Sequence, residues 1–589
     1  MRKEKIVKFA KQSLEDIQIT VLRFPLAIML CVILAGITIY RIEMPYEKLR
    51  DIDEILNRIM AVIVLGVPFS LGVDLLIERF WEKICYHVKI VFNLLKIVLL
   101  VLYYYFALPN IDMVPMLRLS MLAIAMIFIF ISALYMFKRE NFEIFITKIM
   151  TKVAMTAFFA VMLGLGITFT LFAIQSLLYE NMSRDLYAYT WIIINFVFAP
   201  THFLSGFPKI DDEYTVKDYS KVLKLLLIYI VMPIISVFTL VLYTYFAKII
   251  VTQIWPEGIV SYLVLSYAGA GIATLFLVKP FVEENKWVRI FTKVLTKTII
   301  PLLIMMFIAI GIRIGEFGFT ESRYYILLIG IWATFAMIFL NFNKGKRNVV
   351  LPISLAFVLL ISVVGPLSAF NVSIASQNQR FQNILHKNGM IYNKGIVKND
   401  IDIDKYDRRE ISGIIRYFAG THDLDDLEYL PADFTVRDME ETFGFKEEYG
   451  ERSFINSHFH FGINDETQAV DVVGYDVMIR GMMRKLQAGD PKSVQGELFV
   501  VRKGDKIVIL KNDVEIYEYD MMKITEALIK EYGVDFRDRD IVRGDLVVEE
   551  ENSLIRVKLV FSSIFGSYDG DADEIEINGA EVILLIDFK

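Results

Sequence analysis

The chain has 589 residues, of which 55% are hydrophobic, and its mean hydropathy of +0.49 is high for a globular protein. Its net charge of −6 hides a split, because residues 1–370 carry +10 and residues 371–589 carry −16. The acidic second part argues against a nucleic-acid partner. Cys31 and Cys85 both fall in the hydrophobic part, so the C-terminal part is expected to contain no disulfide.

A basic N-terminus, residues 1–23, leads into the apolar run Phe24–Tyr40. This start is similar to a signal peptide, but no small-x-small cleavage pattern follows Ile39 and more apolar runs come after it. We therefore interpret the first run as an uncleaved signal anchor and place the transmembrane domain at residues 24–370.

Eleven apolar stretches of this domain are long enough, at roughly 17 to 25 residues, to cross the hydrocarbon core of a bilayer. They are Phe24–Tyr40, Ile59–Leu76, Ile90–Leu108, Leu117–Phe137, Val153–Tyr179, Leu186–Leu204, Leu223–Ile250, Ile259–Phe281, Val294–Ile314, Tyr324–Leu340 and Val349–Phe370.

The orientation of these spans follows from Lys and Arg, which collect in short cytoplasmic loops. With the N-terminus in the cytoplasm, the inside segments hold 25 Lys and Arg and the outside segments hold nine. An odd number of spans then places the C-terminal domain on the extracytoplasmic side of the cell membrane.

Four prolines at depth, Pro68, Pro200, Pro233 and Pro301, indicate kinked helices or, alternatively, broken helices around a substrate site. Asp74 is an acidic side chain inside a span. It is interpreted either as one half of a structural pair with an interfacial cation such as Arg79 or as an intramembrane functional acid.

Three motifs lie near the last spans: Trp255–Ser261, which contains a WPxG turn, the segment Ile310–Tyr324, and the exit Gly365–Phe370 with Ser373. Together with Asp402–Glu410, they resemble the bacterial membrane family known as domain of unknown function 4153 (DUF4153). The similarity extends from about residue 20 to past residue 420, with Phe317 where the family usually has Tyr. The resemblance implies a polytopic membrane protein and no particular activity, because none is assigned to the family.

The segment from Arg313 to Tyr324 is predicted to form a tight turn between two spans. Gly315 and Gly318 allow the chain to bend sharply, and Thr320 can cap the next helix, with Glu321 in its first turn.

This turn is also a candidate ligand site. Arg313, Glu316, Glu321 and Arg323 place four charges at one interfacial depth, beside Trp255 and Tyr324. Such a set suits either a structural clamp within the protein or the binding of a phosphate or carboxylate headgroup.

The C-terminal part is predicted to be a soluble α+β domain at residues 401–589, after a polar linker at 371–400. Helical spacing marks residues 411–418, and the period of two around Lys503-Gly504-Asp505 indicates a hairpin of 497–502 with 506–511. A strand at 514–519, a helix at 521–532 and strands at 554–561 and 580–587 follow, which suggests a mainly antiparallel sheet with helices on one face.

Two clusters in this domain are similar to metal sites, but neither matches its pattern fully. His458 and His460 share one face of a strand without a third zinc ligand in sequence. The turn from Asp569 to Glu574 lacks the Gly and Glu that a calcium loop requires at its sixth and twelfth positions. We expect no metal and no cofactor.

The sequence contains none of the common nucleotide-binding or hydrolase motifs. The leading hypothesis is a non-enzymatic, multi-pass envelope protein, a transporter-like or scaffold bundle. Besides the lipid bilayer, its expected partner is an anionic lipid headgroup, a cell-wall component or another envelope protein. The alternative is a membrane-embedded transferase or flippase-like protein that acts on lipid-linked substrates at the outer leaflet.

Overall fold

The computed structural model describes residues 15, 17–50, 52–81, 86–136, 140–179, 182–210, 212–252, 259–342, 347–392, 395–398, 403–431, 433–448, 457–462, 470–484, 493–494, 498–512, 514–532, 543–569 and 574–589. The chain divides into two compact units. The first, the helical unit, comprises Met1–Ile396 and Tyr417–Phe434, and the second, the C-terminal unit, comprises Val397–Arg416 and Thr435–Lys589.

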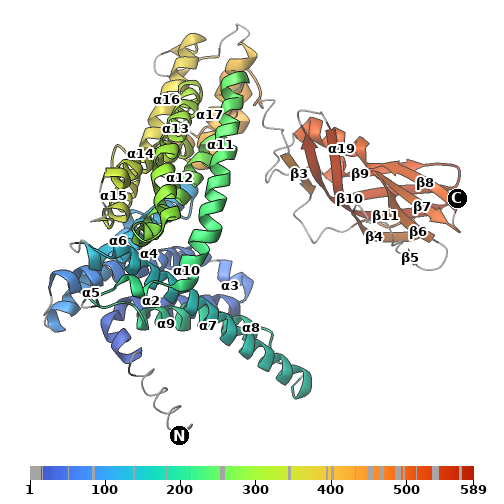
Figure 1. The fold of residues 1–589 in the computed structure, drawn as a ribbon. Coiled ribbons are helices and arrows are strands. Elements are labelled where there is room, and N and C mark those ends of the chain that lie inside the picture. Colours follow the sequence, from blue (N-terminus) through green and yellow to red (C-terminus); the bar gives the residue numbers. More distant parts are fainter. Residues whose placement is uncertain are drawn as a thin grey trace. The chain divides into compact units, whose positions relative to one another are not determined.

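The helical unit is built almost entirely from α-helices (Figure 1). They are α2 (Pro25–Glu43), α3 (Tyr46–Arg50), α4 (Asp53–Phe80), α5 (Tyr86–Phe106), α6 (Met113–Ser132), α7 (Phe142–Leu177), α8 (Asp185–Ile193), α9 (Ala199–Ser205), α10 (Lys221–Leu226), α11 (Met232–Thr252), α12 (Ile259–Val278), α13 (Lys286–Phe317), α14 (Glu321–Phe342), α15 (Val350–Val363) and α16 (Ala369–Lys387).

Within the described residues, nine helical segments are long and apolar enough to cross a membrane. They are Pro25–Glu43, Asp53–Phe80, His87–Phe106, Met113–Tyr135, Phe142–Leu177, Lys221–Thr252, Val260–Phe281, Lys286–Phe317 and Glu321–Phe342. These segments confirm a polytopic helical membrane domain.

The structure does not confirm the predicted count of eleven spans, because two predicted stretches do not reach the same length and apolarity. The stretch Leu186–Leu204 consists of α8, a π-helical turn at Ile194–Phe198 and α9. The last stretch contains α15, which has only 14 residues, because the chain turns at Gly365 (φ +79°) before Pro366.

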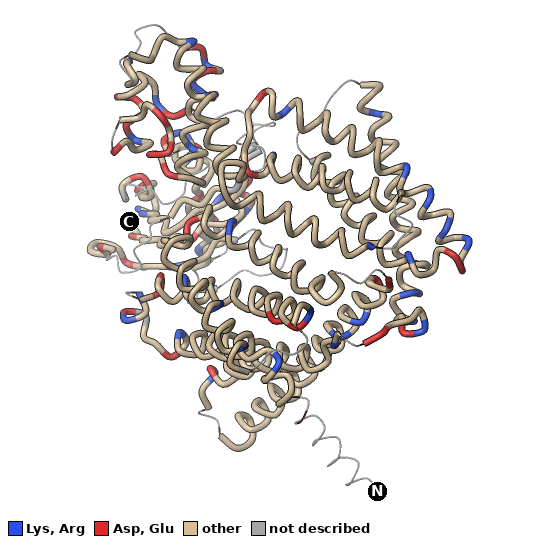
Figure 2. Tube along the Cα trace, turned by 90° about the vertical axis from the view of Figure 1, so that its left-hand side faces the viewer, with Lys and Arg blue, Asp and Glu red and all other residues tan. Residues whose placement is uncertain are grey.

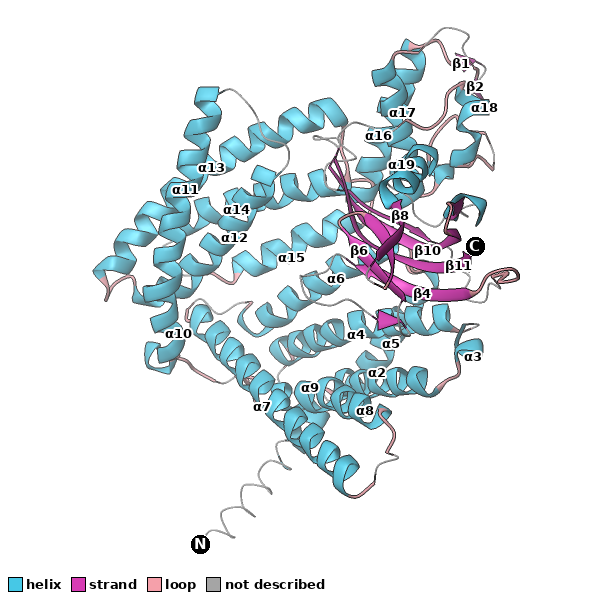
Figure 3. Ribbon diagram, turned by 90° about the vertical axis from the view of Figure 1, so that its right-hand side faces the viewer, coloured by secondary structure: helices cyan, strands magenta, loops and turns pink. Residues whose placement is uncertain are grey.

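The helices stack in a continuous row, α12–α14–α15–α6–α4–α2, in which each helix contacts the next (Figure 3). Their charged residues gather mostly near helix ends, with long uncharged stretches between them (Figure 2). Large apolar side chains such as Leu94 on α5 and Phe169 on α7 are exposed, as the lipid-facing surface of a membrane protein requires.

All four prolines lie within helical segments, and two of them follow a π-helical turn. Pro68 and Pro301 lie inside α4 and α13, and both π-helical turns of this unit, Ile194–Phe198 and Leu227–Val231, come two residues before Pro200 and Pro233. Because proline has no N–H and crowds the preceding turn, a wider turn there relieves the clash.

Residues 371–400, where the sequence predicts a polar linker, contain most of α16. Ser368 caps this helix by accepting a hydrogen bond from the Asn371 N–H. Phe370, Phe381 and Leu385 are buried along one face, so the helix has an apolar stripe that its polar composition obscures. A two-stranded ribbon, β1 (Ile391–Tyr392) with β2 (Gly395–Ile396), follows.

The C-terminal unit contains two antiparallel sheets, where the sequence suggests one. The first has the order β3–β10–β11–β4, with β9 paired to β10, and the second has the order β5–β6–β7–β8. The bounds are β3 (Ser457–Gly462), β4 (Val477–Arg484), β5 (Ser493–Val494), β6 (Leu498–Lys503), β7 (Lys506–Lys511), β8 (Val514–Asp520), β9 (Val547–Glu551), β10 (Ile555–Asp569) and β11 (Glu574–Phe588), with helices α18 (Met439–Phe443) and α19 (Met521–Tyr532). Helix α17 (Lys405–Thr421) begins in this unit, and its end from Tyr417 belongs to the helical unit.

Both sheets and α19 share one hydrophobic core. The predicted alternation on β10 is confirmed, because Ile555, Val557, Leu559 and Phe561 are all fully buried. The buried guanidinium of Arg502 links the sheets by donating to the carbonyls of Met483 and Ile577, on β4 and β11. The C-terminal unit is therefore an α+β unit with antiparallel sheets, as predicted.

Candidate functional site

The candidate site is built around the turn between α13 and α14, which has three residues. Gly318 ends α13 with a φ of +67°, and its N–H still donates to the Ile314 carbonyl. A Cβ atom at Gly318 would lie 2.7 Å from Cδ of Arg380 on α16, so both the backbone conformation and the close approach require glycine.

Arg323, in the first turn of α14, holds the end of α13. Its Nη1 donates to the carbonyls of Phe317 at 2.9 Å and Gly318 at 2.8 Å, and its guanidinium lies over the Phe317 ring at 5.5 Å. A cation at the C-terminus of a helix satisfies carbonyls that have no partner within the helix and interacts favourably with the helix dipole. The structure thus gives Arg323 a role in holding the turn.

Helix α16 holds the same turn from the other side. Gln377 Nε2 donates to the carbonyls of Phe317 at 2.9 Å and Phe319 at 2.6 Å, and the Phe319 N–H donates to Ser376 Oγ at 2.8 Å. The N–H and carbonyl groups of Gly318 and Phe319 are therefore all bonded within the protein.

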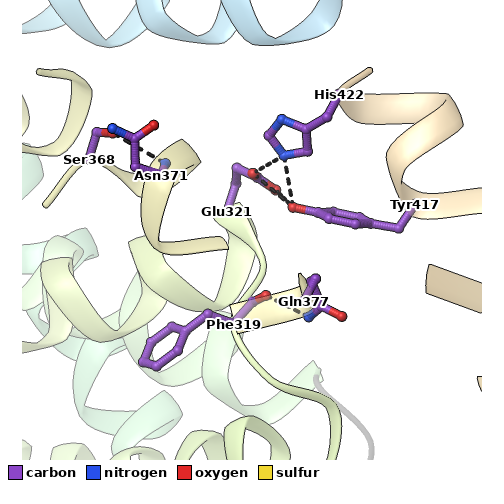
Figure 4. A network of polar contacts seen from close by, with 7 residues as sticks. All are labelled: Phe319, Glu321, Ser368, Asn371, Gln377, Tyr417 and His422. Atoms are coloured by element: carbon purple, nitrogen blue, oxygen red, sulfur yellow. Dashed lines mark hydrogen bonds and ion pairs between the residues drawn. The ribbon is translucent and has the colours of Figure 1, made fainter. Parts of the chain in front are cut away.

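Glu321, the first residue of α14, joins Tyr417 and His422 in a closed set of hydrogen bonds that we call the Glu321 cluster (Figure 4). The Tyr417 hydroxyl lies 2.9 and 2.8 Å from the two carboxylate oxygens. His422 Nε2 lies 2.8 Å from Glu321 Oε1 and 3.0 Å from the Tyr417 hydroxyl. The side chains of His422 and Glu321 are only 2% and 9% exposed.

This burial sets the electrostatics of the cluster. Burial, followed by the negative charge of Glu321, raises the pKa of the Tyr417 hydroxyl, which therefore stays protonated and donates. A carboxylate removed from water needs such donors, because an unpaired buried charge is costly. The three side chains point toward one another (Figure 4), an arrangement that suits holding two segments together.

The segment that carries the cluster's partners is also attached to α16. Asn378 Nδ2 donates to the Asp426 carbonyl at 2.8 Å, and the Glu428 N–H donates to Asn378 Oδ1 at 2.7 Å. The Asn378 amide thus donates one hydrogen bond and accepts another, as a neighbouring β-strand would do with its N–H and carbonyl groups. Residues 417–434 are therefore bonded to two helices of the helical unit, α14 and α16.

Of the six predicted ligand residues, Glu321, Arg323 and Tyr324 form hydrogen bonds within the chain. Arg313 is half-buried and Glu316 is exposed on the last turns of α13. The Tyr324 hydroxyl donates to the Leu367 carbonyl at 2.6 Å, which links α14 to the chain before α16. Trp255 lies outside the described residues.

Asp74 lies in a second polar cluster, inside the helical unit. Its Oδ1 is 2.7 Å from Lys96 Nζ, and Ser70 Oγ lies 3.1 Å from the same ammonium. The sequence pointed to an interfacial cation such as Arg79, but the partner is Lys96 of α5, whose side chain is 2% exposed.

Sequence reasoning missed Lys96, Tyr417 and His422. For Lys96 a signal existed, because a lysine inside a predicted span needs a partner as much as an aspartate does. No local pattern marks Tyr417 or His422, which contact Glu321 across about 100 residues of sequence.

The two metal-like clusters of the C-terminal unit are only partly described. His460 is exposed and its ring stacks on Phe565 at 6.1 Å, while the side chains of His458 and Asp569 and all of residues 570–573 lie outside the described part. In that part, no three His, Cys, Asp or Glu side chains lie close enough to hold a metal ion.

Comparison with known proteins identifies the family. An uncharacterized protein of Pasteurella multocida (strain Pm70) is 22% identical over 255 residues, which cover 43% of this chain and 43% of that protein. The aligned region thus spans less than half of that relative. No solved structure matches the chain. The family described as Domain of unknown function (DUF4153) matches residues 26–393, more than half of the chain, and the chain therefore belongs to this family.

Proposed function

We propose that this multi-pass membrane protein acts without catalysis in the bacterial cell membrane, as a scaffold or transporter-like bundle whose C-terminal domain, residues 401–589, contacts an envelope partner. One observation carries this proposal. The charged side chains that a headgroup site needs, Arg323 and Glu321, are engaged in contacts within the chain. The turn is therefore better suited to hold residues 417–434 than to bind a substrate.

The proposal includes an orientation, with the N-terminus in the cytoplasm and the C-terminal domain on the extracytoplasmic side. The excess of Lys and Arg in alternate connecting segments supports it. This orientation keeps the eleven predicted spans, an odd number, which place the two termini on opposite sides of the membrane and residues 344–348 in the cytoplasm.

Reporter fusions test the orientation. A reporter that works only outside the cytoplasm should be active when fused after Lys589, and one that works only in the cytoplasm should be active within residues 344–348. Cytoplasmic activity of the terminal fusion would overturn the proposed orientation.

Three conservative variants test the role of the turn. Membrane abundance and complementation of a deletion strain should fall together in Arg323→Lys, because lysine is shorter and its ammonium lacks the flat guanidinium face that lies over the Phe317 ring. The same is expected of Glu321→Gln, which removes the charge that Tyr417 and His422 stabilise. Arg313→Lys is the matched control and should be normal in both measurements. Normal abundance with lost complementation in the first two variants would instead indicate a ligand site.

A further inference from the structure

A groove of about 500 Å³ lies between α11 and α13, two of the helices that can cross a membrane. Its walls include Leu240 and Tyr243 on α11 and Trp287, Ile290 and Val294 on α13. This volume lies within the range of roughly 300 to 1,000 Å³ that is typical of small-ligand sites.

The hydroxyl groups of the groove are already bonded. Its four hydroxyl groups each donate to a backbone carbonyl at 2.7 to 3.2 Å; they belong to Ser236, Thr239, Tyr243 and Thr298. The remaining wall is aliphatic and aromatic. A hydrocarbon chain loses nothing by entering such a groove, whereas a polar solute would give up its bonds to water.

A stripe of positive charge runs beside the groove. Lys293 and Lys297 are exposed on α13, one turn apart, and each is a helical neighbour of a wall residue, Ile290 or Val294. No described carboxylate forms an ion pair with either ammonium. Arg289, by contrast, donates to two carbonyls of the preceding loop and is engaged.

We propose that this groove binds an anionic phospholipid of the surrounding bilayer, with an acyl chain along Leu240 and Val294 and the phosphate at Lys293 and Lys297. Helical side chains lean toward the N-terminus of their helix, and long lysine stems reach toward the membrane surface. Lys293 and Lys297 follow Trp287 by about 9 and 15 Å along α13. Their ammonium groups can therefore meet a headgroup beside Ile290 and Val294, and Trp287 marks the end of the groove toward which they lean. The site is separate from the α13–α14 turn and independent of the proposed function.

Lipid retention by the purified full-length protein tests this site. After delipidation in detergent, the protein is incubated with phosphatidylglycerol or with phosphatidylcholine of the same acyl chains, and bound lipid is counted by native mass spectrometry. Phosphatidylglycerol should bind more tightly. In Lys293→Gln/Lys297→Gln its affinity should fall about 30-fold, since each lysine near a charged lipid contributes roughly fivefold.

Two further variants distinguish this site from general surface attraction. Val294→Phe fills the groove without changing charge and should also lower retention, because an acyl chain can no longer enter. Lys217→Gln/Lys221→Gln removes two exposed lysines away from the groove and should leave retention unchanged. An equal loss in both lysine pairs, or equal retention of the two lipids by the unaltered protein, would overturn the proposal.

Discussion

The sharpest prediction concerns Tyr417→Phe, which removes one hydroxyl from the Glu321 cluster and keeps the ring. The Glu321 carboxylate then loses a donor at 2.8 to 2.9 Å and keeps His422 and its own backbone N–H. A hydrogen bond to a charged group contributes about 1.5 to 3 kcal/mol. Because the Glu321 side chain is only 9% exposed, water can replace little of that loss. Opening of residues 417–434 should therefore become about 10- to 100-fold more frequent.

Hydrogen exchange on the purified full-length protein measures this opening directly. The His422 N–H donates to Phe418 and the Leu427 N–H donates to Leu424, so both amides report whether the segment is folded against α14 and α16. Tyr392→Phe is the control, because that side chain is 69% exposed. Unchanged exchange in Tyr417→Phe would refute the view that the cluster holds the segment.

The pH dependence of hydrogen exchange in residues 417–434 is a second test of the same cluster. The pKa of Tyr417 is raised in the folded state, first by burial and then by Glu321, while a released segment ionises near the ordinary value of about 10. Release therefore loses a proton above about pH 10, and protection of the segment should fall as pH rises past that value. Tyr417→Phe should flatten this dependence relative to Tyr392→Phe.

Four further outcomes follow from the structure. Lys96→Met should lower membrane abundance more than Lys96→Met combined with Asp74→Asn, because the single change leaves a buried carboxylate unpaired, at a cost of about 3 to 5 kcal/mol; equal abundance would contradict the pairing. Gly318→Ala should lower thermal stability by at least about 1 kcal/mol, because its φ of +67° strains any Cβ. A fragment from about residue 398 to the end should be soluble, indifferent to reductant and free of metal that survives dialysis against a chelator. In it, the absorbance of ionised tyrosine should include a late step near pH 12, because burial, then Glu550 and Asp520, raise the pKa of Tyr519 to about 12; Tyr519→Phe should remove that step and leave the other late tyrosines, among them Tyr517, unchanged.

Much of the helical unit could be predicted because a bilayer imposes one simple requirement, about 20 apolar residues in helical conformation. The nine segments that meet it were all recognisable. The stretch around Pro200 was not decisive, because its polar residues Asn195 and His202 interrupt the apolar run. Helix α16 was missed because its polar residues outnumber its buried ones.

The strands of the C-terminal unit were predictable one by one, and their assembly was not. The hairpin of β6 and β7 has a local cause, since Gly504 takes a φ of +64° between two alternating runs. The division into two sheets depends on which strand pairs with which across more than 100 residues, as β3 does with β10. Arg502, whose guanidinium bonds to carbonyls of both β4 and β11, carries no sequence signal for that role.

The charges of the α13–α14 turn show why composition identifies a site without identifying its partner. Near a membrane surface, the hydrogen bonds of a carboxylate or guanidinium are strengthened equally whether the partner is a ligand or the protein's own chain, because both contacts exclude water. The sequence could therefore recognise Glu321 and Arg323 as unusual, but it could not distinguish a headgroup from Tyr417, His422 or the carbonyls of α13. The geometry of the structure distinguishes these partners. Glu321 and Arg323 already form hydrogen bonds with groups of their own chain. A headgroup could bind to either side chain only by displacing those bonds.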